Sequence, residues 1–228
     1  MKDIVFEFDD KFNKEDGKCI IEECISEFDE SEKEKEDTVR HVFSDPDNKH
    51  IEVVLTKVIV LNEIYSTQLN SNAKNEKEVI EGRKYHMDVL TMAKHIIENE
   101  EFTEWCNSDI EEQRLKAVDY IRRGKSKLRK SYHSEAYSFA TKYCSWHNPE
   151  KYPIVDRYSK GMIYYLNQKF IFHKKDLKTT DLGDYKTFCE AFGSLQRYLN
   201  EECDKKFEYK DLDKFLWLYG KKNGVTID

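Results

Sequence analysis

The sequence predicts an all-α fold in the form of a single compact domain of several helices. Apolar residues recur at helical spacing over 51–65 and again over 85–96, and the segment 109–124 has carboxylates in its first turn and arginines in its last. With 228 residues, of which 39% are hydrophobic, the chain can bury a substantial core. We expect the helical domain to span 49–228 and residues 1–48 to form an irregular, acidic N-terminal extension.

The extension carries most of the negative charge. Residues 1–50 hold 17 acidic and 8 basic residues, whereas the other 178 residues hold 28 and 30. Within it, "IVFEFDDKF" alternates like a short strand, "KCIIEECISEF" favours a helical turn or two, and "DESEKEKEDT" is typical of an exposed, flexible connector. The net charge of −7 therefore does not exclude a nucleic-acid partner for the rest of the chain.

The remaining elements follow in order. "HIEVVLTKVIVLNEIYSTQL" is long enough for a helix although its β-branched residues favour a strand locally. Further helices are expected over 76–98, over 109–124 with a stop at Gly124, and over about 134–146. Pro149 and Pro153 hold the next loop out of helix. Three more amphipathic helices are then predicted over 157–169, 184–201 and 210–220.

Composition excludes several classes of protein. No run of eighteen apolar residues and no charged-then-apolar leader is present, so we expect a cytoplasmic protein without membrane contact. The six cysteines form no CxxC pair, which argues against a disulfide framework or an iron–sulfur cluster. Cys144 and His147 could share a helix face, but two ligands are too few for a metal site. We therefore expect neither a metal nor a cofactor.

A basic segment precedes a single carboxylate, Asp156. Residues 121–160 hold ten bases and three acids, and six of the bases fall between Arg122 and Lys130 with no acid among them. Such a run is usually a solvated face, but in an otherwise acidic chain it also suits phosphate binding. Asp156 directly precedes a predicted helix, so it is either an ordinary N-cap or a carboxylate whose placement there serves chemistry.

Two segments carry a resemblance to a known family. "YPIVDRY", residues 152–158, is similar to the segment that bears the catalytic aspartate in DNA glycosylases of the helix-hairpin-helix (HhH-GPD) superfamily, with Asp156 at the aspartate position. "VIVLNEIYST", residues 58–67, resembles the end of that family's buried helix. The chain departs from the family's glycine-rich hairpin, since it has only Gly124 in a lysine-rich segment, and it has Ser138 where bifunctional members carry a lysine.

The resemblance implies a monofunctional DNA glycosylase that acts on double-stranded DNA, with Asp156 as the catalytic carboxylate. It places candidate substrate-binding residues near the extruded base and leaves the DNA backbone to basic side chains. The substrate-binding candidates are Asn62, Tyr65, Tyr143, Trp146 and His147; the backbone candidates are Arg122, Arg123, Lys125, Lys127, Arg129, Lys130 and Lys142.

The chemistry suits these residue types. Breaking a base–sugar bond builds positive charge on the sugar, which a nearby carboxylate stabilises, and aromatic side chains stack on a flipped base. Damaged, mismatched or modified bases remain open as substrates, the last implying a role in defence against phage DNA rather than DNA repair. Two other functions remain open as well: a non-catalytic nucleic-acid-binding module, and a helical protein-interaction domain. Aromatic and histidine candidates at helical spacing are, in addition, often core residues.

Overall fold

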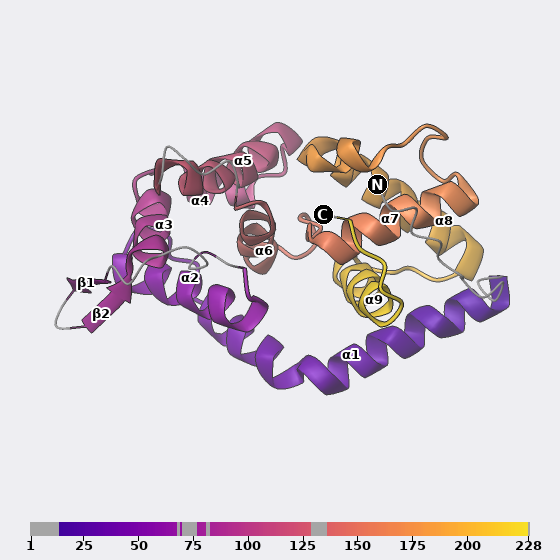
Figure 1. Cartoon of the computed structure of the whole chain (residues 1–228), viewed down its shortest axis with the longest axis horizontal. Helices are drawn as coiled ribbons and strands as arrows, with labels where there is room; N and C mark the ends of the chain where they lie inside the picture. Colours follow the sequence, from indigo (N-terminus) through magenta and orange to yellow (C-terminus); the bar gives the residue numbers. More distant parts are fainter. Residues whose placement is uncertain (1–13, 68, 70–76, 81–82, 129–135, 228) are drawn as a thin grey trace. The chain divides into compact units, whose positions relative to one another are not determined.

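The computed structural model describes residues 14–67, 69, 77–80, 83–128 and 136–227 (Figure 1). Side chains are described in these ranges except at 14–19, 77–80, 83–87 and 125–128. The predicted all-α class is confirmed, with one small two-stranded hairpin among the described residues. The elements are α1 (Lys14–Phe43), α2 (Ile51–Tyr65), β1 (Lys77–Ile80), β2 (Arg83–His86), α3 (Met87–Ile97), α4 (Phe102–Asn107), α5 (Glu111–Leu128), α6 (Tyr137–His147), α7 (Arg157–Phe170), η1 (Thr179–Gly183), α8 (Tyr185–Cys203) and α9 (Tyr209–Lys222).

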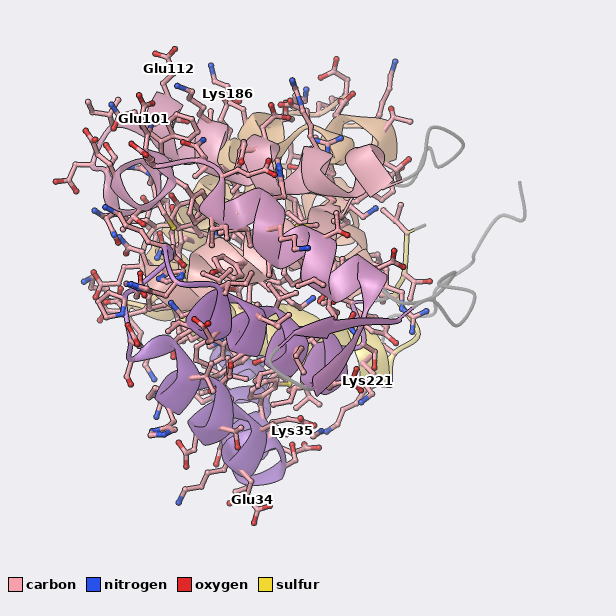
Figure 2. The ribbon with its side chains drawn as sticks, turned by 90° about the vertical axis from the view of Figure 1, so that its left-hand side faces the viewer. Glu34, Lys35, Glu101, Glu112, Lys186 and Lys221 are labelled. Atoms are coloured by element: carbon pink, nitrogen blue, oxygen red, sulfur yellow. The ribbon has the colours of Figure 1, made fainter. Side chains whose placement is uncertain are left out.

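The N-terminal extension is more regular than expected, because α1 runs through it as one 30-residue helix. The predicted flexible connector lies inside this helix. A buried stripe explains why: apolar residues every three or four positions continue on both sides of the charge run, while charged side chains such as Glu34 and Lys35 point outward (Figure 2). The stripe comprises Ile21, Cys24, Phe28, Val39 and Phe43.

The predicted helix over 76–98 is shorter than expected. Its first third forms the antiparallel hairpin of β1 and β2, in which Lys77 pairs with His86 and Ile80 with Arg83. Helix α3 begins only at Met87. The β-branched pair Val79–Ile80 and the nearby Gly82 favour a hairpin in the sequence. The prediction of one helix over 76–98 relied instead on the apolar stripe of the helix that follows.

The predicted helix end at Gly124 is wrong, because α5 continues to Leu128. A Cβ atom at position 124 would lie 2.4 Å from His95 Cδ2, so glycine is needed here for close packing of α5 on α3 rather than for a helix end. The first bases of the basic segment, Arg122 to Lys127, consequently lie in a helix. Arg129 and Lys130 lie outside the described residues.

Contacts divide the chain into two compact units whose limits differ from the expected boundary at residue 48. Unit 2 comprises 34–154, with α2 packed on α3 and α6, and α5 packed on α3, α4 and α6. Its core contains apolar side chains from each of these helices, among them Val58, Leu61, Met92, Phe102 and Ile121. Figure 1 shows these helices together.

Of the described residues, unit 1 comprises 14–33 and 155–227. Helix α7 packs on α8 and α9, and η1 packs on α7 and α8. Gly220 of α9 lies against Met162 and Tyr158 of α7, where a Cβ atom would come within 3.0 Å of Met162 Cγ. This close approach holds the start of α7, and with it Asp156, in a fixed place within unit 1.

Candidate functional site

Asp156 is the N-cap of α7. Its Oδ1 accepts hydrogen bonds from the backbone N–H groups of Tyr158 (2.9 Å) and Ser159 (2.8 Å). Ser159 Oγ accepts in turn from the backbone N–H of Asp156 (2.9 Å), which completes a reciprocal capping box. The ordinary structural role expected for this residue is therefore filled.

The second carboxylate oxygen, Oδ2, does not take part in the cap. Among the described residues, no hydrogen bond reaches Asp156 Oδ2, and the side chain is half-buried rather than enclosed. One oxygen thus holds the carboxylate in place, and the other can contact a ligand. The helix N-terminus also favours the negative charge of the group.

The chain around Asp156 is firmly held. Tyr152 is fully buried and donates a hydrogen bond to the backbone oxygen of Cys106 (2.9 Å), while Val155 is buried directly before the aspartate. On the other side, the backbone oxygen of Arg157 accepts from Ile227 N (3.1 Å). Arg157 itself is exposed, and its Nη2 donates to Tyr158 Oη (2.7 Å).

The aromatic candidates lie together in unit 2 around α2, α6 and the end of α1. The rings of Tyr65 and Trp146 are 6.5 Å apart, and Phe43 contacts both Trp146 (6.3 Å) and His147 (5.0 Å). Tyr65 and Trp146 are half-buried, so a ligand can reach part of each ring. These two are the aromatic candidates best placed to stack on a base.

Tyr143 has a core environment instead, and His147 is half-buried with its ring 5.1 Å from that of Tyr143. Tyr143 is fully buried and donates to Asn48 Oδ1 (2.6 Å), and burial raises the pKa of its phenol well above the ordinary value. Burial, with a smaller effect of the Lys57 charge, lowers the pKa of His147 to about 3. His147 Nε2 is enclosed without a hydrogen-bond partner among the described residues. The structure therefore favours a structural role for both residues.

Asn62 also has a structural role. Its Oδ1 accepts from Leu69 N (2.9 Å) and from Thr67 Oγ1 (3.1 Å), so the amide holds the chain that follows α2. Ser66 adopts the left-handed conformation there, with φ of 47°. Only 6% of Asn62 is exposed.

Lys142, predicted to contact the DNA backbone, is only 6% exposed. Its Nζ donates to Ser138 Oγ (2.6 Å) and lies 5.7 Å from the ring centroid of Tyr65. Such a position suits contact with one group inserted next to Tyr65 better than contact with phosphates along an open face.

The basic segment is only partly described. Arg122 lies with its guanidinium 4.7 Å from the Tyr137 ring, and exposed Arg123 forms an ion pair with Asp119 (2.8 Å). Lys125 and Lys127 lie in α5, but their side chains, like all of Arg129 and Lys130, lie outside the described residues.

Sequence reasoning missed Lys57. It is fully buried in α2, donates to the backbone oxygen of Asp47 (2.6 Å), and lies 5.5 Å from the Phe43 ring centroid. Burial lowers its pKa from 10.5 to about 8, against the opposing effect of Asp45 and Asp47. The signal was available, since Lys57 is the only lysine in an otherwise apolar helical stretch.

The described part of the chain holds no group of three or more His, Cys, Asp or Glu side chains arranged for a metal ion. Of the pair considered from the sequence, Cys144 is fully buried in unit 2 with Cys106 close to its thiol, and His147 is half-buried. Of the helices in the described ranges, none is both long and apolar enough to cross a membrane.

A protein-family model described as HI_0787_N, N-terminal domain, matches residues 20–151, which is more than half of the chain. The chain belongs to the HI_0787_N family. A protein of Haemophilus influenzae (strain ATCC 51907 / DSM 11121 / KW20 / Rd), described as "Uncharacterized protein", is 33% identical over 179 residues, which cover 77% of this chain and 70% of the relative. No solved structure matches the sequence.

The HI_0787_N match has a structural counterpart. It begins in α1 and ends at residue 151, close to the limit of unit 2 at 154. The matched region therefore contains Tyr65, Lys142 and Trp146, whereas Asp156 lies five residues beyond it and belongs to unit 1.

Proposed function

We propose that this protein is a DNA glycosylase-like enzyme that hydrolyses the N-glycosidic bond of a damaged or modified base in double-stranded DNA. The observation that carries the proposal is the divided use of the Asp156 carboxylate. Its Oδ1 is fixed by two backbone N–H groups, and its Oδ2 is left with no partner among the described residues. A cap alone needs only the first oxygen.

The chemistry requires a held negative charge. As the bond from the sugar to the base breaks, its electron pair leaves with the base and positive charge develops on the anomeric carbon. A carboxylate oxygen next to that carbon stabilises the charge and can accept a proton from the attacking water. The water oxygen then bonds to the sugar, and the departing base takes up a proton, which leaves an abasic site.

The base must leave the duplex before it can be attacked. Within unit 2, the half-exposed rings of Tyr65 and Trp146 offer stacking surfaces for bases, and the Nζ of Lys142 lies near Tyr65. Arg123 and the lysines that follow it supply charge for phosphates. The proposal places the protein in the cytoplasm, acting in DNA repair or in defence against phage DNA with modified bases.

The test is base release from duplexes that carry uracil, 8-oxoguanine, alkylated purines, or hydroxymethylated or glucosylated cytosine, followed by hot alkali to cleave abasic sites. Asp156→Asn keeps an N-cap side chain and removes the charge, so it should fold normally and lose at least about 100-fold in rate. Asp184→Asn is the matched control, because Asp184 caps α8 through Thr187 N (2.9 Å) in the same unit. Its activity should equal that of the wild type.

Three outcomes contradict the proposal. Equal activity of Asp156→Asn and wild type would remove the aspartate from the chemistry. Absence of cleavage throughout the panel, with steep salt-dependent DNA binding intact, would instead favour a non-catalytic nucleic-acid-binding module in which Asp156 is only a cap. Weak DNA binding with little salt dependence would favour a protein-interaction domain.

A further inference from the structure

Ile171, the residue that ends α7, combines two unfavourable features. It adopts the left-handed conformation (φ 50°, ψ 46°), which a β-branched residue rarely tolerates and which glycine normally supplies at a helix end. Its side chain is also 54% exposed. Neither backbone geometry nor packing within unit 1 accounts for isoleucine here, and its exposed side chain is available to a partner outside the chain.

Two phenylalanines fix the direction of Ile171. Phe170 and Phe172, its neighbours in sequence, both stack on Tyr198 of α8, at ring distances of 5.5 and 6.1 Å and interplanar angles of 28° and 29°. The backbone N–H of Ile171 also donates to Asn167 O (2.9 Å). Anchored on both sides, the isoleucine is presented on a rigid support.

The surroundings of Ile171 are basic. Residues 169–178 contain four lysines (169, 174, 175 and 178) and one acid, Asp176. Lys175 is exposed and makes no ion pair with another described residue, whereas Lys174 pairs with Asp181 (3.3 Å). Exposed Arg197 lies close by, since its Nη2 donates to Ser194 Oγ (3.1 Å), which also contacts His173.

His173 presents a hydrogen-bond acceptor next to these bases. Ser194 has one hydroxyl proton, which it donates to Glu190 O (2.8 Å), so its oxygen must accept from His173 Nδ1 (3.2 Å). Burial and the charges of Lys174 and Arg197 lower the pKa of His173, against the opposing effect of Glu190. The neutral ring thus carries its proton on Nδ1, and Nε2, which no described residue contacts by a hydrogen bond, can accept one.

A second exposed isoleucine, Ile110, shows that exposure alone does not identify a residue that contacts a partner. Ile110 is 58% exposed, but Asp109, Glu111 and Glu112 surround it in sequence, and it lacks a positive φ. Ile171 differs in being strained, flanked by stacked aromatic residues and set among lysines. Those differences match the chemistry of an apolar side chain that enters a base stack between two phosphate backbones.

We propose that the segment Phe170–Lys175 is a DNA wedge, in which Ile171 inserts between stacked base pairs, Lys175 and Arg197 bind the flanking phosphates, and His173 Nε2 accepts from an amino group of a base edge. The choice of DNA rests on the proposed function above. A single apolar side chain offers too little area to anchor a membrane, and hydrocarbon would offer no donor to His173.

The test uses the full-length protein and duplexes with 2-aminopurine, whose fluorescence rises when its stacking is broken. Wild type should raise the fluorescence. Ile171→Gly should abolish the rise and weaken duplex affinity about tenfold, as expected for losing a buried aliphatic side chain. Because glycine adopts the left-handed conformation without strain, the melting temperature of the Ile171→Gly protein should not fall below that of wild type. Ile110→Ala, the matched control, should behave like wild type.

The other outcomes overturn the wedge. An unchanged fluorescence rise in Ile171→Gly would remove the isoleucine from the duplex. Wild-type binding without any rise would exclude insertion, and binding to anionic phospholipid vesicles but not to DNA would assign the segment to a membrane surface. The fluorescence rise does not require base release, so the wedge proposal can be refuted while Asp156-dependent cleavage persists. Conversely, a protein that releases no base but still unstacks the duplex would support the wedge proposal and contradict the proposed glycosylase function.

The phosphate contacts have a separate readout. Replacing both Lys175 and Arg197 with glutamine should weaken binding to all duplexes alike and reduce the slope of log affinity against log salt by about two. An unchanged slope would show that these two residues bind no phosphate. The same slope measured for Ile171→Gly should equal that of wild type, since no charge is lost.

Discussion

Replacing His147 with glutamine should remove an acid-sensitive contribution to stability. In the folded protein, burial lowers the pKa of His147 from 6.5 to about 3. Below pH 6.5 the unfolded chain therefore binds a proton that the folded chain does not, so the free energy of unfolding falls as the pH falls. Each pKa unit corresponds to about 1.4 kcal/mol, which predicts a loss of at most about 2 kcal/mol in wild type between pH 7 and pH 5.

The assay is urea unfolding followed by far-ultraviolet circular dichroism at pH 7 and pH 5. The loss between the two pH values should be smaller in His147→Gln than in wild type by up to that amount, whatever the absolute stability of the variant. His41, which is exposed in α1, supplies the control, and His41→Gln should keep the wild-type loss. If His147→Gln also kept it, the ring would titrate in the folded state, the enclosed environment would be refuted, and His147 would return as a candidate for binding substrate.

Three further predictions test single features by unfolding measurements. Asp156→Ala should lower the free energy of unfolding by about 1 kcal/mol through loss of the cap, while Asp156→Asn should change it little; equal losses would contradict the capping geometry. The depressed pKa of Lys57, about 8 against 10.5, predicts that wild type gains about 2 kcal/mol relative to Lys57→Met between pH 8 and pH 10, because only the unfolded lysine holds its proton there. Asp29→Asn removes an ion pair with Lys214 and should cost less than about 1 kcal/mol, with the difference disappearing in 1 M NaCl; a larger or salt-independent cost would mean that Asp29 does more than pair at the surface.

Much of the fold follows from helical periodicity. The expected helix after residue 50 is α2, and the helix expected over 157–169 is α7, because in both a dense apolar stripe decides the structure despite unfavourable local preferences. Helix α1 was missed for the opposite reason. Its stripe is interrupted by the charge run, so the sequence predicted a helical turn or two before the run and a flexible connector within it, although the buried positions keep their spacing from Ile21 to Phe43.

The candidate site was less predictable, because exposure depends on tertiary packing. Asp156 could be placed at a helix start from the loop and helix pattern alone, and its capping box follows from local geometry. Tyr143 and Trp146 could not be distinguished, since both lie on α6, yet one is fully buried and the other half-exposed. Gly124 carried an ambiguous signal as well, because a glycine near the end of a pattern can either stop a helix or admit a neighbouring side chain.

Net charge is a poor guide to the partner of this protein because much of the acidity is used within unit 1. Carboxylates of α1 pair with lysines near the C-terminal end of the chain. Glu22 pairs with Lys205, which follows α8, while Glu27 pairs with Lys222 and Asp29 with Lys214, both in α9. The same helix buries Ile21 and Phe28, so it acts as a packed cap rather than as a free acidic tail. Pairing of this kind occupies lysines that would otherwise attract phosphates and leaves the exposed Lys175 beside Ile171 without such a partner among the described residues. A negatively charged chain can therefore still present a small basic surface, which is what the proposed binding of DNA requires.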